Sequence, residues 1–263
     1  MDMFNAPARE YMVMPVRTIL DSEQAPSAEE KMASWGISAL AVVDATGAMT
    51  GVVSRTDLLR AGRLASVNGR RRRALTLPRV PVRELMTGTV EIVARETPLS
   101  EIARRMVRHH IHRLYVSDDR RPAGVISTKE MMRAVIDARL LQPLSSILHE
   151  SVVVVRAQDP LALAIDRMAA AHHVGLAVVE DGWPVGAFTQ ADALGAREAP
   201  PDDRVDHWMD PRVICLPLAM PVFRVAEQAF ATRARRVLGV DADGVRGIAT
   251  GMDFARLVMT GRN

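Results

Sequence analysis

A glycine, a short apolar stretch, a hydroxyl residue and an acid three positions later recur four times along the chain. A Ser or Thr followed at that spacing by Asp or Glu suits two kinds of chemistry. At the start of a helix the pair forms a capping box, in which the two side chains bond free backbone N–H groups. In a binding cleft the carboxylate can accept charge-assisted hydrogen bonds from two neighbouring hydroxyls, while the helix N-terminus attracts an anion. The four copies span Gly51–Asp57, Gly124–Glu130, Gly186–Asp192 and Gly247–Asp253.

These copies belong to a longer internal repeat, because two further patterns keep their distance from the motif glycine. A marker pattern ends at Met12, Met86, Leu148 and Met209, which lie 39, 38, 38 and 38 residues before the four glycines. A proline follows each of the last three marker residues by 12 positions. Such coincident spacings indicate four copies of one supersecondary unit. The glycine that opens each motif permits a close backbone approach.

Each unit has the pattern β-α-β-β-α. In the second unit, apolar strands are expected at 90–93, 114–116 and 124–126, and Pro98 marks a helix start before residues with helical spacing. One unit alone leaves a sheet face exposed, so we expect it to pair with a neighbour. We predict an α+β fold with repeats at residues 8–62, 82–138, 144–197 and 205–260, and an Arg-rich linker at 63–81.

The linker carries the most uneven charge in the chain. Eight arginines and no acid lie between Asp57 and Glu84, with Arg70–Arg73 consecutive, whereas the whole chain has a net charge of only +3. A turn is expected at Asn68-Gly69. Three interpretations stay open: a solvated spacer, a cover over a cleft that meets nucleotide phosphates, or a contact surface for nucleic acid or an acidic protein.

Other features exclude several classes of protein. The single cysteine, Cys215, rules out an internal disulfide and favours a reducing, cytoplasmic location. No apolar run approaches the ~18 residues of a membrane span, and the first ten residues lack a secretory signal pattern. No P-loop, GxSxG or HExxH motif is present, and no set of metal ligands stands at matching spacing. We therefore expect no enzyme activity and no protein-bound metal.

The repeated unit and its closing motif resemble the CBS domain, in four copies arranged as two tandem pairs (Bateman modules). The resemblance covers almost the whole chain. It implies that paired repeats bind adenosine nucleotides or related adenosyl ligands in the clefts between them. The motif hydroxyl would meet phosphate, the acid would meet both ribose hydroxyls, and the first two strands would contact the base. The implied nucleotide-binding residues are Ser54, Arg55, Asp57, Val90, His112, Ser127, Lys129, Glu130, Val152, Gly175, Thr189, Asp192, Val213, Arg236, Thr250 and Asp253.

The four motifs differ in how well their residues suit nucleotide binding. Glu130 is one methylene longer than the Asp of the other three copies, so it suits a sugar contact less well. Arg55 and Lys129 can offset phosphate charge in the first two motifs. The third and fourth motifs lack such a cation, so any phosphate there needs charge from elsewhere in the fold.

From these features we expect a regulatory sensor that binds AMP, ADP or ATP, with no metal beyond Mg²⁺ carried by the nucleotide. S-adenosylmethionine and cyclic dinucleotides stay open as ligands. We expect a homo-oligomer, in the simplest case a dimer, that acts on a regulated protein the sequence does not identify. Nucleic acid is a less favoured partner, and no membrane is expected. The alternative is a basic scaffold or adaptor, whose linker binds nucleic acid or an acidic protein while the repeats serve only oligomerisation.

Overall fold

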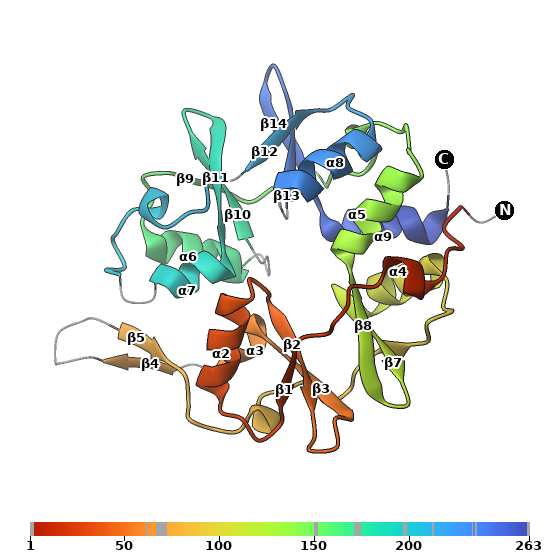
Figure 1. Cartoon of the computed structure of the whole chain (residues 1–263). Coiled ribbons are helices and arrows are strands. Elements are labelled where there is room, and N and C mark those ends of the chain that lie inside the picture. The colour runs from red at the N-terminus through yellow and green to blue at the C-terminus, as the bar shows by residue number, and fades with distance from the viewer. Residues whose placement is uncertain are drawn as a thin grey trace.

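The computed structural model describes residues 3–61, 63–66, 73–149, 152–170, 175–196, 199–211, 213–232, 234 and 236–261. Within them the chain forms four β-α-β-β-α units, each introduced by a short helical turn (Figure 1). In each unit the central strand pairs in parallel with the first strand and antiparallel with the third. The predicted α+β fold is confirmed. No helix in these ranges is long and apolar enough to cross a bilayer.

The elements follow the same order in every repeat. Repeat 1 has α1 (Ala8–Tyr11), β1 (Thr18–Leu20), α2 (Ala25–Ser34), β2 (Ala39–Val43), β3 (Met49–Ser54) and α3 (Arg55–Ala61). Repeat 2 has η1 (Val82–Glu84), β6 (Ile92–Val93), α4 (Leu99–His109), β7 (Arg113–Asp118), β8 (Arg121–Ser127) and α5 (Thr128–Asp137). Repeat 3 has η2 (Leu144–Ser146), β9 (Val154–Arg156), α6 (Leu161–Ala170), β10 (Gly175–Glu180), β11 (Trp183–Thr189) and α7 (Gln190–Gly195). Repeat 4 has η4 (Val205–His207), β12 (Ile214–Pro217), α8 (Val222–Thr232), β13 (Arg236–Asp241), β14 (Gly244–Thr250) and α9 (Gly251–Thr260).

Each marker segment leaves its own repeat and lies against the third strand of the neighbouring repeat. The exchange is reciprocal between repeats 1 and 2, and again between repeats 3 and 4. The residue after each marker forms a bridge with the third strand, two positions before the motif hydroxyl. The four bridges join Val13 to Val125, Thr87 to Val52, His149 to Ile248, and Asp210 to Ala187. Repeats 1 and 2 therefore form one interlocked module, and repeats 3 and 4 form a second.

This exchange explains the glycine that opens every motif. A Cβ atom at Gly51, Gly124 or Gly186 would lie 2.4–2.5 Å from the sulfur of the marker methionine that arrives from the other repeat. At Gly247 a Cβ atom would lie 2.9 Å from Cβ of Leu148. Side chains do not approach each other this closely, so a residue larger than glycine at these positions would force the marker segment to shift. The close approach that we predicted at the glycines is made by the marker residue.

The two modules meet through helices around a common centre (Figure 1). Helices α4 and α5 of repeat 2 pack on α8 and α9 of repeat 4, and their buried side chains form one continuous core. Repeats 1 and 3 keep separate apolar cores, and α3 lies beside α7. At the start of α9, a Cβ atom on Gly251 would lie 2.5 Å from Oγ1 of Thr128 in α5. The second and fourth motifs therefore lie in contact across the boundary between modules.

The Arg-rich linker includes a two-stranded antiparallel ribbon of β4 (Arg63–Ser66) and β5 (Arg73–Thr76). Figure 1 shows this ribbon projecting from the body formed by the four sheets, and Leu77, just after the ribbon, packs against the apolar core of repeat 1. The turn expected at Asn68-Gly69 and the arginines at 70–72 lie outside the described residues. The three interpretations of the linker stay predictions.

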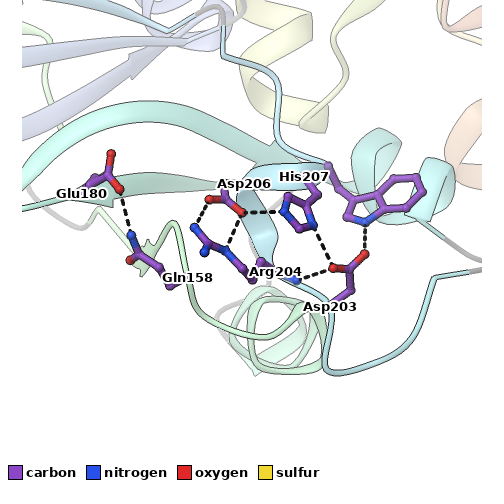
Figure 2. A network of polar contacts seen from close by, with 7 residues as sticks. Gln158, Glu180, Asp203, Arg204, Asp206 and His207 are labelled. Carbon is purple, nitrogen blue, oxygen red and sulfur yellow. Dashed lines mark hydrogen bonds and ion pairs between the residues drawn. The ribbon is translucent and has the colours of Figure 1, made fainter.

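A polar network holds the segment that leads from repeat 3 into repeat 4 (Figure 2). Asp203 accepts hydrogen bonds from Nε1 of Trp208 at 2.8 Å and from the amide of Arg204 at 2.9 Å. Nδ1 of His207 lies 2.9 Å from the same carboxylate. The bonds from Trp208, His207 and the Arg204 amide hold the pKa of Asp203 below its usual value. The neighbouring pair of Arg204 and Asp206 likewise lowers the pKa of Asp206.

Candidate functional site

All four motifs place the acid against the hydroxyl residue as in a capping box at the start of the closing helix, and a backbone N–H donates back to the hydroxyl at Ser54, Ser127 and Thr250. In each, one oxygen of the acid accepts a hydrogen bond from the backbone N–H of the Ser or Thr at 2.7–2.8 Å. The same oxygen accepts from the hydroxyl at 2.6–2.9 Å. A phosphate that binds at the hydroxyl must therefore compete with the acid for the hydroxyl proton. The hydroxyl and acid pairs are Ser54 with Asp57, Ser127 with Glu130, Thr189 with Asp192, and Thr250 with Asp253.

The sheet register brings the start of each second strand beside a motif hydroxyl. The opposed pairs are Ala39 with Ser54, Arg113 with Ser127, Gly175 with Thr189, and Arg236 with Thr250. The second-strand residues named in our prediction thus lie next to the motifs. In repeat 2 the equivalent of Gly175 is Arg113, one position after the predicted His112. His112 lies at the same corner, where its carbonyl accepts from the amide of Thr128 at 3.1 Å.

The valines expected to contact the base stand just before the first strands. Val90, Val152 and Val213 precede β6, β9 and β12, because parallel pairing with the central strand begins one or two residues later. All three are half-buried. Val90 packs in the apolar cluster between the sheets of repeats 1 and 2, together with Ala41 and Tyr115. The contact of the three valines with a base stays a prediction.

An arginine crosses from one repeat to the other in each module. Nη2 of Arg113 donates to Oγ of Ser38 in repeat 1 at 2.7 Å. The carbonyl of Ser38 accepts from the amide of Arg55 at 3.1 Å, so the Arg113 guanidinium lies close to the first motif. In the second module the guanidinium of Arg236 covers Gly175, where a Cβ atom would lie 2.9 Å from both Cζ and Nη2. Arg236 therefore brings a cation from repeat 4 to the side of the third motif, since Gly175 is opposite Thr189.

The four acids differ in how much of the carboxylate is left for a ligand. Asp253 is 3% exposed, and its second oxygen, Oδ1, lies 2.5 Å from Nε2 of His149. Glu130 is also buried, with 8% exposed. Asp57 and Asp192 are half-buried, and Oδ1 of Asp57 meets no hydrogen-bond donor in the described part of the chain. The more open acids belong to repeats 1 and 3, whereas repeats 2 and 4 bury theirs beside the shared helical core.

Other features of the surface lie away from the motifs. Among the described residues, no group of three or more His, Cys, Asp or Glu side chains has the geometry of a metal site. A surface hollow of about 480 Å³ lies along β9 and α6, with Arg156, Asp159 and Arg167 in its lining. Arg156 pairs with Val179 at the end of β10 that is remote from Thr189. This hollow is thus separate from the third motif.

A comparison with protein-family models identifies the family. The CBS domain model matches residues 8–63, 82–137 and 144–199, which together make up more than half of the chain. The chain belongs to the CBS-domain family. The fourth repeat lies outside the matched segments, and its sheet and helices follow the same order as those of the other three.

Three particular relatives extend this comparison. An uncharacterized 33.4 kDa protein in a ribosomal RNA operon of Thermofilum pendens is 30% identical over 179 residues, which cover 63% of this chain and 56% of the relative. The chain thus spans about half the length of that curated relative. The crystal structure of protein MJ1225 from Methanocaldococcus jannaschii, proposed as an archaeal homolog of g-AMPK, is 17% identical and has a TM-score of 0.76; the match covers 95% of this chain and 99% of that one. An uncharacterized conserved protein from Pyrococcus horikoshii is also 17% identical, with coverage of 96% and 99% and a TM-score of 0.68. At these identities the two structures show a shared fold alone.

Sequence reasoning missed four residues that the structure brings to the motifs: Ser38, Arg113, His149 and Arg256. Spacing could have found Arg113, which precedes the motif hydroxyl by 14 residues, as Gly175 and Arg236 do in their repeats. His149 follows a marker directly, but the crossing of the marker into repeat 4 leaves no trace in the local sequence.

Proposed function

We propose that the protein is a regulatory sensor without enzyme activity of its own, which binds an adenosine nucleotide such as AMP, ADP or ATP between paired repeats. The observation that carries this proposal is the position of Arg113, whose guanidinium reaches from repeat 2 to Ser38 beside the first motif. An arginine held there can pair with phosphate oxygens through two N–H groups at once. The family resemblance supplies the ligand class, since its paired repeats bind adenosyl ligands.

The cleft at repeat 1 has the most complete set of ligand groups. Oδ1 of Asp57 is open to accept from a ribose hydroxyl, while its Oδ2 keeps the helix cap in place. Arg55 and Arg113 supply two cations from different repeats, and the Ser54 hydroxyl lies on the acid, at 2.6 Å from Oδ2 of Asp57. A nucleotide in this cleft would therefore contact both repeats and strengthen their interface.

The repeat 3 cleft is the second candidate, with Thr189, Asp192 and Gly175 beside the guanidinium of Arg236. The repeat 2 cleft has an exposed Lys129 but a buried Glu130, so we expect it to bind ribose less well. The homo-oligomer and the regulated protein stay predictions that accompany this function.

The direct test is calorimetric titration of the full chain with AMP, ADP and ATP. Arg113→Ala should weaken binding roughly tenfold to a hundredfold, because a hydrogen bond to a charged group contributes ~1.5–3 kcal/mol. Arg108→Ala is the matched control, since Arg108 is an exposed arginine of the same repeat on α4. Equal affinity in both variants would remove Arg113 from the site.

A second measurement decides between the sensor and the adaptor. A nucleotide at about 100 times its dissociation constant should add ~2.7 kcal/mol to the free energy of unfolding and raise the melting temperature. No thermal response to millimolar AMP, ADP or ATP would contradict the sensor function. Binding of duplex DNA or RNA that falls steeply with salt would then support the adaptor.

A further inference from the structure

One position in each repeat lies where it can close the neighbouring cleft. We call it the gate position: it is the residue directly after the marker, which forms a bridge with the third strand of the partner repeat. Every gate residue stands two ladder positions before the motif hydroxyl of that partner. The gate residues are Val13 over repeat 2, Thr87 over repeat 1, His149 over repeat 4 and Asp210 over repeat 3.

At repeat 4 the gate residue reaches the motif acid. His149 is pinned to the strand by two backbone hydrogen bonds with Ile248, at 2.9 and 3.0 Å. Its Nε2 lies 2.5 Å from Oδ1 of Asp253. Arg256, one turn further along α9, donates to the same oxygen, and its Nη1 lies 2.9 Å from Nε2 of His149. The other oxygen, Oδ2, accepts from the amide and hydroxyl of Thr250 at 2.7 and 2.9 Å.

The contacts with His149, Arg256 and the amide and hydroxyl of Thr250 occupy both oxygens of the Asp253 carboxylate. A carboxylate offers about four lone-pair sites, and three protein donors and the Nε2 atom of His149 lie against those of Asp253, of which only 3% is exposed. A ribose would have to displace His149 or Arg256 with neutral hydroxyls. Removing such a partner leaves a buried charge without compensation, which is costly. The fourth motif thus has its own side chains in the place of a ligand diol.

Repeat 1 provides the same motif in an open form. Its gate residue, Thr87, is exposed, and Oδ1 of Asp57 meets no hydrogen-bond donor in the ranges that the structure describes. The residue equivalent to Arg256 is Arg60, which is also exposed. The two motifs share an Asp, a hydroxyl and an arginine three positions later, and they differ in the gate residue and in the burial of Asp253 beside the core that repeats 2 and 4 share.

We infer that His149 and Arg256 close the fourth cleft, and that the gate residue decides how many ligands one chain can hold. The part about the number of ligands rests on the proposed function, because it requires nucleotide binding. The closure of the fourth cleft by His149 and Arg256 does not depend on that function.

Exchange of the gate residues tests the inference with nucleotide. In titrations of the full chain with AMP and with ATP, His149→Thr should add one bound nucleotide per chain relative to the wild type. The reciprocal variant Thr87→His should lose one, because it places an imidazole beside Asp57. Both side chains are largely exposed, so neither change threatens folding. An unchanged stoichiometry in His149→Thr would overturn the inference.

A measurement without ligand separates this inference from the proposed function. If no variant binds nucleotide, the proposed function fails, and the closure is judged by melting temperatures in a double-variant cycle. His149→Ala should lower the melting temperature less in the Asp253→Asn background than in the wild type, since its partner is already neutral. Equal losses in the two backgrounds would contradict the closure.

If Asp253→Asn does not fold, Arg256→Ala takes its place in the cycle. Loss of both His149 and Arg256 should then lower the melting temperature by more than the sum of the single losses, because Oδ1 of the buried carboxylate keeps neither of its side-chain partners. Additive losses would overturn the inference.

Discussion

The exchange of markers makes a quantitative prediction at Gly186. A Cβ atom there would lie 2.5 Å from Sδ and 3.1 Å from Cγ of Met209, and 3.0 Å from the carbonyl oxygen of Asp210. Gly186→Ala should therefore force the marker of repeat 4 away from β11. Overpacking of this kind costs about 1–3 kcal/mol. For a chain of this size, each kcal/mol corresponds to a fall of roughly 2–4 °C in melting temperature.

The assay is thermal melting of four proteins: the wild type, Gly186→Ala, Met209→Ala and the double variant. Met209→Ala removes Sδ and Cγ and leaves only the carbonyl contact, so Gly186→Ala should cost clearly less in that background. Gly88→Ala is the matched control, since a Cβ atom there would meet no atom within 4 Å. If Gly186→Ala melts like the control, or if its cost is the same with and without Met209, the role given to the motif glycine is wrong.

Three other predictions follow from the site and its supports. Asp57→Asn should weaken nucleotide binding in calorimetry by more than it lowers the stability of the free protein, because the cap contributes only ~0.5–2 kcal/mol; a lower melting temperature with unchanged affinity would make Asp57 a cap alone. Replacing Arg70–Arg73 with serine should leave the melting temperature nearly unchanged, and selective loss of ATP over AMP affinity, or loss of salt-sensitive DNA or RNA binding, would identify what the linker contacts. The pKa values of Asp203 and Asp206 are held below their usual range in the folded protein, so their contribution to stability is complete at neutral pH and is lost as the pH falls through the folded-state values; Asp203→Asn should flatten the fall in melting temperature below pH 4, and an unchanged slope would contradict this account.

Local sequence was sufficient for the repeated unit but not for its partners. Apolar periodicity, Pro98 and the capping spacing each depend on a few neighbouring residues, and these features predicted the β-α-β-β-α order and the helix starts that the structure has. The bridge between Val13 and Val125 joins residues more than a hundred positions apart. No local sequence pattern indicates such a pairing. The sequence therefore predicted that another segment approaches the motif glycine closely, but it did not identify the marker as that segment.

The residues of the candidate site also fall into those that local sequence predicted and those that it did not. The motif hydroxyls and acids could be predicted, because the chemistry lies within one stretch of chain. The burial of Glu130 depends on the core that repeats 2 and 4 share, and the contact of His149 with Asp253 depends on a marker that crosses between repeats. Repeat spacing could have found the position of Arg113, but no local pattern indicates its contact with Ser38, because packing of distant segments brings the two side chains together.

The reciprocal exchange of markers also makes the pair of repeats, rather than the single repeat, the smallest unit that can be duplicated or lost without disturbing the packing. A single repeat cut from the chain would lose the marker that covers its third strand and would carry one that has no strand to cover. Duplication or loss of one repeat would leave an unmatched glycine surface, whereas duplication of a pair would leave every strand covered. Gene rearrangements in this architecture should therefore preserve even numbers of repeats. A break in the chain between the two repeats of a module should leave both pieces held together by the marker segments that they exchange.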